Sequence, residues 1–207
     1  QHAAMTAALP ETVPAWRAIG PKNCGGRIEA VDSPRGKPGV IYAGVGSGGV
    51  WKSVNGGLSW SHVFASESTF AIGDVTVDPN DENTVWVGTG EAHLGGMSYD
   101  GTGVFRSTDG GATWSTCTIP FQPLWQKQDL QLHLDGANVL AVWRRSYGYH
   151  DQIWTSRSTD GGNSWSVATR LDAGPSWANG VADTRLFVVG DGANIRVFWS
   201  FYRAYYN

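Results

Sequence analysis

Short stretches in which apolar and polar residues alternate recur along most of this 207-residue chain. Alternation with a period of two is the pattern of a β-strand that buries one of its faces. Turn-forming residues separate these stretches, as at Ser33–Gly39, Asp78–Asn83 and Asp135–Gly136. The pattern predicts strands over Arg27–Val31, Val40–Gly44, Val50–Ser53, Ile72–Val77, Thr84–Gly88, Gly103–Ser107, Leu130–Leu134, Asn138–Arg144, Ile153–Arg157, Thr184–Val189 and Ile195–Phe201. An all-β fold is therefore expected.

A short motif repeats within this pattern. It reads STDGGATW at Ser107–Trp114 and STDGGNSW at Ser158–Trp165, with an eroded copy, SVNGGLSW, at Ser53–Trp60. The spacings between the tryptophans are 114 − 60 = 54 and 165 − 114 = 51 residues. Asp or Asn followed by two glycines makes a tight turn, and the Trp opens the next strand with a large apolar surface. The motif is predicted to clasp a β-hairpin and to perform no chemistry, through Ser53, Asn55, Trp60, Ser107, Asp109, Trp114, Ser158, Asp160 and Trp165.

Self-similarity at this spacing, with about four strands per repeat, is typical of the blades of a β-propeller. Each blade is expected to be a four-stranded antiparallel sheet with an outermost strand after the Trp of the motif, as at Trp165–Thr169. The sequence accommodates about four blades, of which the last is incomplete. We place the blades at residues 27–64, 71–119, 129–170 and 182–207.

The two ends of the chain do not follow the repeat. Residues 1–15 are expected to form an extended arm, and residues 16–20 resemble an outermost strand that could close the ring. The fourth blade lacks a third strand and a motif of its own, which leaves an aromatic-rich strand edge at residues 195–206. A four-bladed ring, a fragment of a larger propeller and a half-ring that pairs with a second copy all remain open. We favour completion from outside this chain.

Composition narrows the function. Charged residues make up 16% of the chain and the net charge is −3, so we expect no nucleic-acid partner. No apolar run approaches the ~20 residues of a membrane span, which argues against membrane insertion. The two cysteines, Cys24 and Cys117, indicate neither a disulfide framework nor a metal site, and whether they pair is left open. No cofactor or metal is expected. The N-terminal Gln and the abundance of Trp, Gly and Ser favour a secreted or extracellular protein, at the cell surface or in the periplasm as alternatives.

The repeated motif resembles the Asp-box, or BNR repeat, of one family of β-propellers, which includes sialidases, sortilin-type propellers and family-74 xyloglucanases. The N-terminal half, about residues 16–119, is similar to sortilin-type repeats. The C-terminal half, about residues 129–207, is similar to sialidase-like repeats. The first likeness rests on Trp16–Ile28, Tyr42–Ser53 and Val87–Glu91, and the second on Asp135–Val139 and Ser156–Gly162.

In such blades the loop between the second and third strands lies beside the central channel, opposite the Asp-box. Aromatic and charged residues there suit sugar recognition, because rings stack on pyranose faces and charged groups bind hydroxyls. Two rim loops are predicted, at Thr89–Thr102 and at Arg145–Gln152. The candidate ligand-binding residues are His93, Tyr99, Arg145, Tyr149, His150 and Arg203. Glu29 and Asp74 are expected to accept bonds from neighbouring backbone near the channel.

A glycosidase needs two carboxyl groups across one cleft. Glu91 with Asp100 or Asp151 is the candidate catalytic pair. The blade-one segment Ala43–Gly49 lacks the catalytic Asp of family-74 enzymes, which weighs against xyloglucanase activity. Arg27 stands near the first of the three arginines of a sialidase, but the full set cannot be placed.

The sequence thus favours an extracellular carbohydrate-recognition propeller that binds a glycan or polysaccharide, either as a lectin-like module or as a degenerate glycosidase. One alternative is an assembly module that completes its sheet with another chain through its C-terminal strand. A second alternative is an active glycoside hydrolase of sialidase-like type.

Overall fold

The computed structural model describes residues 27–91, 99–120, 127–147, 150–172, 186–191 and 194–199. Every regular element in these ranges is a β-strand, arranged in four antiparallel sheets that follow one another along the chain. The predicted all-β propeller architecture is confirmed at the level of the blades. The expected arm at residues 1–15 and closing strand at residues 16–20 lie outside the described residues.

Each of the first three sheets has four strands in sequence order, and we call them blades 1 to 3. The fourth sheet, blade 4, has two strands among the described residues. Blade 1 consists of β1 (Ile28–Asp32), β2 (Ile41–Val45), β3 (Gly49–Ser53) and β4 (Ser61–His62). Blade 2 consists of β5 (Ile72–Asp78), β6 (Asp81–Thr89), β7 (Val104–Ser107) and β8 (Ser115–Cys117). Blade 3 consists of β9 (Lys127–Asp135), β10 (Asn138–Tyr147), β11 (His150–Ser158) and β12 (Thr169–Arg170), and blade 4 of β13 (Leu186–Asp191) and β14 (Asn194–Trp199).

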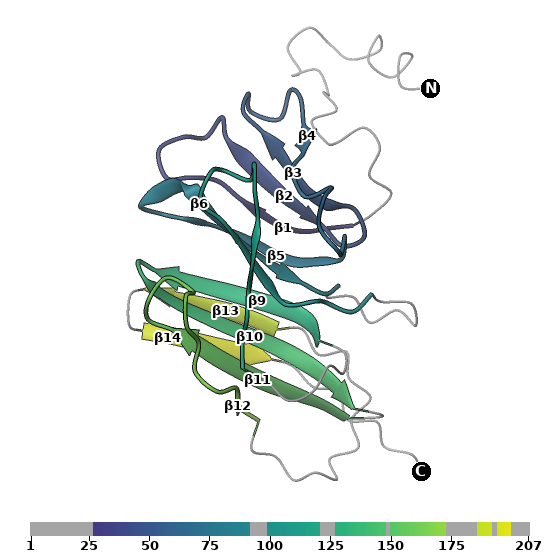
Figure 1. Ribbon diagram of the computed structural model, residues 1–207, viewed down its shortest axis with the longest axis vertical. Coiled ribbons are helices and arrows are strands. Elements are labelled where there is room, and N and C mark those ends of the chain that lie inside the picture. Colours follow the sequence, from purple (N-terminus) through teal and green to yellow (C-terminus); the bar gives the residue numbers. More distant parts are fainter. Residues whose placement is uncertain are drawn as a thin grey trace, which may run out of the picture.

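The blades pack face to face in sequence order, with β1 against β5, β5 against β9, and β9 against β13 (Figure 1). A separate apolar cluster fills each interface. Tyr42, Phe64 and Phe105 belong to the cluster between blades 1 and 2, whereas Trp86 and Trp143 belong to the one between blades 2 and 3. The third cluster joins blade 3 to blade 4 through Leu140, Val142, Ile153 and Leu186. The core is therefore divided into layers, one for each pair of blades.

A carboxylate from each inner strand bonds to the backbone of the next blade. Asp32 accepts the Val77 N–H (2.7 Å), and Asp74 accepts the Leu132 N–H (2.8 Å). Asp129 accepts the Leu186 N–H (3.0 Å). The expectation that Asp74 accepts a backbone bond is confirmed. These charge-assisted bonds link successive blades close to the axis about which they are arranged.

The Asp-boxes form tight turns between the third and fourth strands. In blade 2 the Ser107 hydroxyl donates to Asp109 (2.7 Å) and accepts the Gly111 N–H (2.8 Å). The Asp109 carboxylate also accepts the N–H (2.8 Å) and hydroxyl (2.6 Å) of Thr113, and these bonds lower the pKa of Asp109 to about 2. Gly110 and Gly111 take positive φ values of 69° and 91°. The boxes at Ser158 and Ser53 repeat the serine-centred bonds.

Two predicted segments differ from the structure. Arg145–Gln152 is predicted as a loop, but β10 and β11 continue as a long hairpin with Arg145 opposite Gln152 and only residues 148–149 between the strands. Cross-strand pairing of aromatic and long polar side chains favours this extension. The outermost strand of blade 3 is the second difference. It lies at Thr169–Arg170 rather than directly after Trp165, because Ser166 instead bonds Arg157 and Ser156.

Cys117 carries a free thiol, and Cys24 lies outside the described residues. Among the residues that the structure describes, no helix is long and apolar enough to cross a membrane.

Candidate functional site

A group of charged and aromatic side chains lies at the ends of blades 1 and 2 that face away from the Asp-boxes. β3 and β7 each run from this end to an Asp-box, so the two sites are separated by the length of a strand. The group consists of Arg27, Glu29, Phe70, Glu91 and Tyr99, and we call it the rim cluster. Its members come from four separate places in the chain, which the packing of β1 against β5 brings together.

Glu91, immediately after β6, is held on two sides. One carboxylate oxygen accepts the backbone N–H of Tyr99 (3.3 Å), and the other lies 3.4 Å from the Arg27 guanidinium. The Glu91 N–H in turn donates to the Tyr99 carbonyl (3.0 Å). Glu91 is thereby fixed against the end of the loop that follows it.

Arg27 also forms an ion pair with Glu29, so one guanidinium bridges two carboxylates. The Glu29 and Glu91 side chains are 9% and 12% exposed, whereas Arg27 is 39% exposed. Gly46 lies between the two acids: a Cβ there would be 2.9 Å from Glu29 Oε1 and 3.1 Å from Glu91 Oε1. The expectation that Glu29 binds backbone is not met, because its carboxylate pairs with Arg27.

Phe70 and Tyr99 form an exposed aromatic pair beside these acids. Their ring centroids are 5.4 Å apart in an edge-to-face arrangement. The two residues are 51% and 54% exposed, which is high for aromatic residues that contact each other. The Phe70 carbonyl accepts the Gly49 N–H (2.9 Å), which ties the segment before β5 to the start of β3. The pair therefore offers apolar ring surface to solvent on a fixed backbone.

A second charged group lies on the inner strands of blade 3. Asp129 and Arg144 are only 3% and 1% exposed. Burial raises the pKa of Asp129 to about 6, and the negative charge of Glu29 raises it further, while the Leu186 N–H and Arg144 act in the opposite direction. Asp129 has a φ of 51°, the sole positive value at a non-glycine residue among the described residues. The influence of Glu29 on Asp129 shows that blades 1 and 3 share one electrostatic environment.

The structure brings together some of the predicted site residues. Glu91 and Tyr99 contact each other, while Asp100 follows Tyr99 as an exposed residue with no hydrogen bond or ion pair to the rest of the described chain. Arg145, His150 and Asp151 lie in the β10–β11 hairpin of blade 3 rather than in a rim loop. His93, Tyr149 and Arg203 lie outside the described residues.

Phe70 and Asp129 belong to this region and were not among the candidates. Phe70 stands in a turn before β5, where nothing in its local sequence separates it from a buried strand residue. Asp129 lies inside an otherwise alternating strand, and an acidic residue at such a position is a signal that could have identified it. Among the residues described by the structure, no group of His, Cys, Asp or Glu is arranged to hold a metal ion.

These features define a segment of an Asp-box β-propeller. A family model described as Sortilin-Vps10 (sortilin, neurotensin receptor 3) matches residues 48–195. Because the match spans well over half of the chain, the chain belongs to the Sortilin-Vps10 family.

Two related proteins are xyloglucanases. The chain is 27% identical over 180 residues to a xyloglucanase of Hypocrea jecorina (strain QM6a), which covers 80% of this chain and 21% of that protein. The structure of a GH74 xyloglucanase from Xanthomonas campestris matches with a TM-score of 0.56 and 18% identity, over 90% of this chain and 29% of that chain. A sialidase structure from Streptococcus pneumoniae matches at a TM-score of 0.40 and 21% identity, over 65% and 19% of the two chains. The chain thus spans about a fifth of the curated xyloglucanase.

Proposed function

We propose that this chain is the polysaccharide-binding part of a glycoside-hydrolase-type β-propeller, acting outside the cell. The observation that carries this proposal is the rim cluster. It combines an exposed aromatic pair with a bridged pair of carboxylates on one end of two adjacent blades. The similarity to xyloglucanases supports a plant-type polysaccharide as the ligand class and supports an extracellular location.

The chemistry of the rim cluster suits a sugar. The faces of Phe70 and Tyr99 can pack on the C–H surfaces of pyranose rings, and their 5.4 Å contact limits the entropy lost on binding. Arg27 and Glu91 offer donors and acceptors for hydroxyl groups at the edge of the same surface. Fixed aromatic surface with a few polar groups at its edge is a common arrangement in ligand sites.

Binding is the function that Glu91 supports best. Its carboxylate is engaged by Arg27 and by the Tyr99 N–H, an arrangement that holds an anion in place. Asp100 and Asp151, the proposed catalytic partners, have no contact with Glu91 in the described residues. Hydrolysis, including the sialidase-like type, therefore ranks below glycan binding in this proposal.

The test is a titration of the purified chain with xyloglucan oligosaccharides by isothermal titration calorimetry. We expect Tyr99→Ala to weaken binding about ten-fold or more, because it removes half of the aromatic surface. Phe198→Ala is the matched control, since Phe198 is 53% exposed but lies in blade 4, and it should leave the affinity unchanged. Mass spectrometry of the same mixtures detects cleavage.

Three outcomes decide between the functions. Retained, uncleaved oligosaccharide supports the binding function, whereas products that disappear in Glu91→Gln would make the chain a hydrolase. Equal affinity of Tyr99→Ala and the unaltered chain, or no binding to any polysaccharide tested, would reject the rim cluster as a glycan site.

A second candidate function is self-assembly through blade 4. Phe187, Val189 and Phe198 are 56%, 52% and 53% exposed, and they lie on the face of β13 and β14 that points away from blade 3. Exposed apolar side chains gathered on one face of a sheet favour contact with another protein surface. A second copy of this chain is the partner proposed here.

A further inference from the structure

The contact between blades 1 and 2 places an Asp-box on a specific pair of side chains. Tyr42 in β2 and Lys52 in β3 are cross-strand neighbours. The Tyr42 hydroxyl (3.0 Å) and the Lys52 ammonium (2.7 Å) both donate to the carbonyl of Gly110, the first glycine of the blade 2 box. The box thus joins its own blade to the preceding one.

The contact between blades 2 and 3 uses the equivalent positions. Trp86 in β6 and Arg106 in β7 are cross-strand neighbours, and the guanidinium lies 5.4 Å from the indole. The blade 3 box sits on this pair. A Cβ on Gly162 would be 2.3 Å from the Trp86 ring, and a Cβ on Gly161 would be 3.9 Å from the Arg106 guanidinium. An apolar side chain, an adjacent cation and a Gly-Gly turn therefore recur at successive interfaces.

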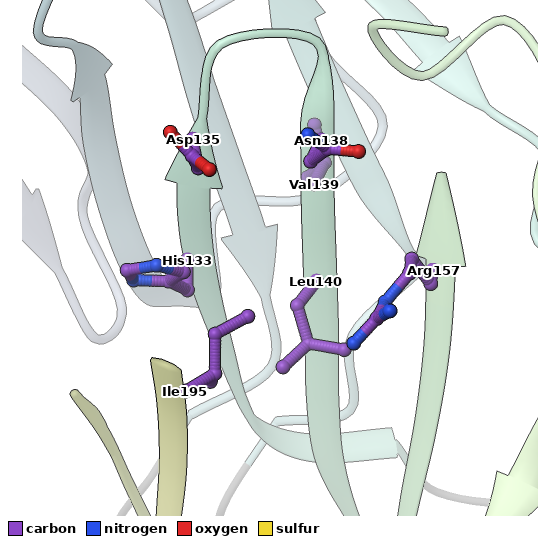
Figure 2. A pocket seen from close by; sticks show the side chains of 7 residues that line it. All are labelled: His133, Asp135, Asn138, Val139, Leu140, Arg157 and Ile195. Atoms are coloured by element: carbon purple, nitrogen blue, oxygen red, sulfur yellow. The ribbon is translucent and has the colours of Figure 1, made fainter. Parts of the chain in front are cut away.

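Blade 3 carries the same pair at the same register, but it holds no box among the described residues. Leu140 in β10 is opposite Arg157 in β11, as Trp86 is opposite Arg106. A pocket of about 150 Å³ lies at this position, between blade 3 and Ile195 of β14 (Figure 2). Arg157 is exposed, and its guanidinium makes no hydrogen bond within the described part of the chain.

Two further features mark the pocket as a receptor for a polar turn. The buried Nε2 atom of His133, which lines the pocket beside Leu140, has no hydrogen-bond partner. The outer edge of β14 is paired with no described strand, although the second strand of every other blade pairs there with a third strand. An unpaired strand edge can accept another strand through main-chain hydrogen bonds.

We propose that the pocket over Leu140 and Arg157 is the seat of an Asp-box turn from a β-hairpin of another polypeptide, whose first strand pairs with β14. The carbonyl of the first box glycine accepts a hydrogen bond from Arg157, as the Gly110 carbonyl does from Lys52. The small pocket suits two glycines. This inference refines the assembly candidate, but it does not require the chain to associate with itself.

The probe is a fluorescently labelled synthetic peptide of residues 103–119, which contains the third and fourth strands and the box of blade 2. Fluorescence anisotropy reports its binding to the full 207-residue chain. We expect saturable binding that Arg157→Ala weakens about ten-fold, since a charged donor to a desolvated carbonyl is lost. A peptide with Gly110→Val should not bind, because a β-branched residue disfavours the required φ of 69°.

Arg196→Ala is the matched control on the protein. Arg196 is an exposed residue of β14 whose neighbour Ile195 lines the pocket, so its side chain points to the other face. It should leave the peptide affinity unchanged, and hydrogen exchange should slow at β14 amides when the peptide is bound. The proposal is overturned if the peptide fails to bind, or if Arg157→Ala and Arg196→Ala weaken binding equally. It is also overturned if the Gly110→Val peptide binds as well as the original. Self-association or glycan binding would survive any of these results.

Discussion

Asp74 illustrates how a single carboxyl group takes part in the contact between two blades. Its Oδ2 atom accepts the Leu132 N–H (2.8 Å) and lies 3.4 Å from the Thr76 hydroxyl. Burial raises the pKa of Asp74 from its ordinary value of 3.8 to about 7, and the nearby charge of Asp32 adds to this, although the hydrogen bonds oppose it. The folded chain therefore retains a proton that the unfolded chain releases at lower pH.

The sign of the resulting pH dependence follows directly. Because the folded-state pKa is raised, the stabilising contribution of protonated Asp74 is complete below pH 3.8 and is lost as the pH rises through about 7. We expect the free energy of unfolding of the unaltered chain to fall relative to that of Asp74→Asn over this window. Since the residue keeps partial exposure, the difference should be on the order of 1–2 kcal/mol.

Urea denaturation at a series of pH values between 4 and 7 measures this difference. Asp100→Asn, which changes an exposed carboxyl, serves as the control and should follow the unaltered chain. Parallel curves for Asp74→Asn and the unaltered chain over the whole range would contradict the role given to Asp74.

At the scale of the element, the Asp-box hairpin acts both within its blade and on the neighbouring one. The serine and the Asp or Asn side chain satisfy backbone groups of the turn, while the two glycines approach the preceding blade. The glycines are required for two separate reasons, a positive φ and the close approach. The boxes of blades 2 and 3 separate these two reasons.

Gly162 and Gly111 hold the same position in successive boxes, with φ values of 85° and 91°. A Cβ on Gly162 would be 2.3 Å from the Trp86 ring, whereas a Cβ on Gly111 would be 3.3 Å from Val63. We expect Gly111→Ala to cost about 1–2 kcal/mol through its backbone conformation. Gly162→Ala should cost about 1–3 kcal/mol more, because the Trp86 ring must move.

Chemical denaturation followed by circular dichroism compares the two variants directly. The backbone cost is shared, so the difference between them reports the contact with Trp86. Equal losses of stability in the two variants would show that this contact does not constrain the turn.

At the scale of the whole molecule, the exposed apolar face of blade 4 governs association. We expect the chain to form dimers as its concentration rises, and Phe187→Ser to raise the dimer dissociation constant about ten-fold or more by removing apolar contact area. Leu58→Ser is the control: Leu58 is 58% exposed but lies in the blade 1 box, so dimerisation should be unaffected. Sedimentation velocity measures the mass, and a purely monomeric chain at high concentration would remove this candidate.

The blade architecture could be predicted from sequence because its signals are local. Alternation along a strand and the spacing of Ser, Asp, Gly and Trp in each box are readable within a few residues. The strand ends were less accessible: the β10–β11 hairpin extends through Tyr147 and His150, where cross-strand partners decide the conformation.

The candidate site was predicted only in part, because its residues meet through the packing of separate blades. Glu91 and Tyr99 share one loop, so sequence placed them together. Arg27 reaches Glu91 across 64 positions of the chain, and Phe70 reaches Tyr99 from the turn before β5. Neither contact has a local signature, since both depend on which strands lie side by side in the folded protein.

The carboxylate links between the inner strands all point the same way along the chain. Asp32, Asp74 and Asp129 each bond to the blade that follows, and never to the blade that precedes. A blade thus carries an acceptor for its successor and an N–H for its predecessor, so both halves of the joint are inherited together. Tandem duplication of one blade within the gene would insert a unit that fits its new neighbours on both sides. Propellers of different sizes can arise in this way without any change to existing joints.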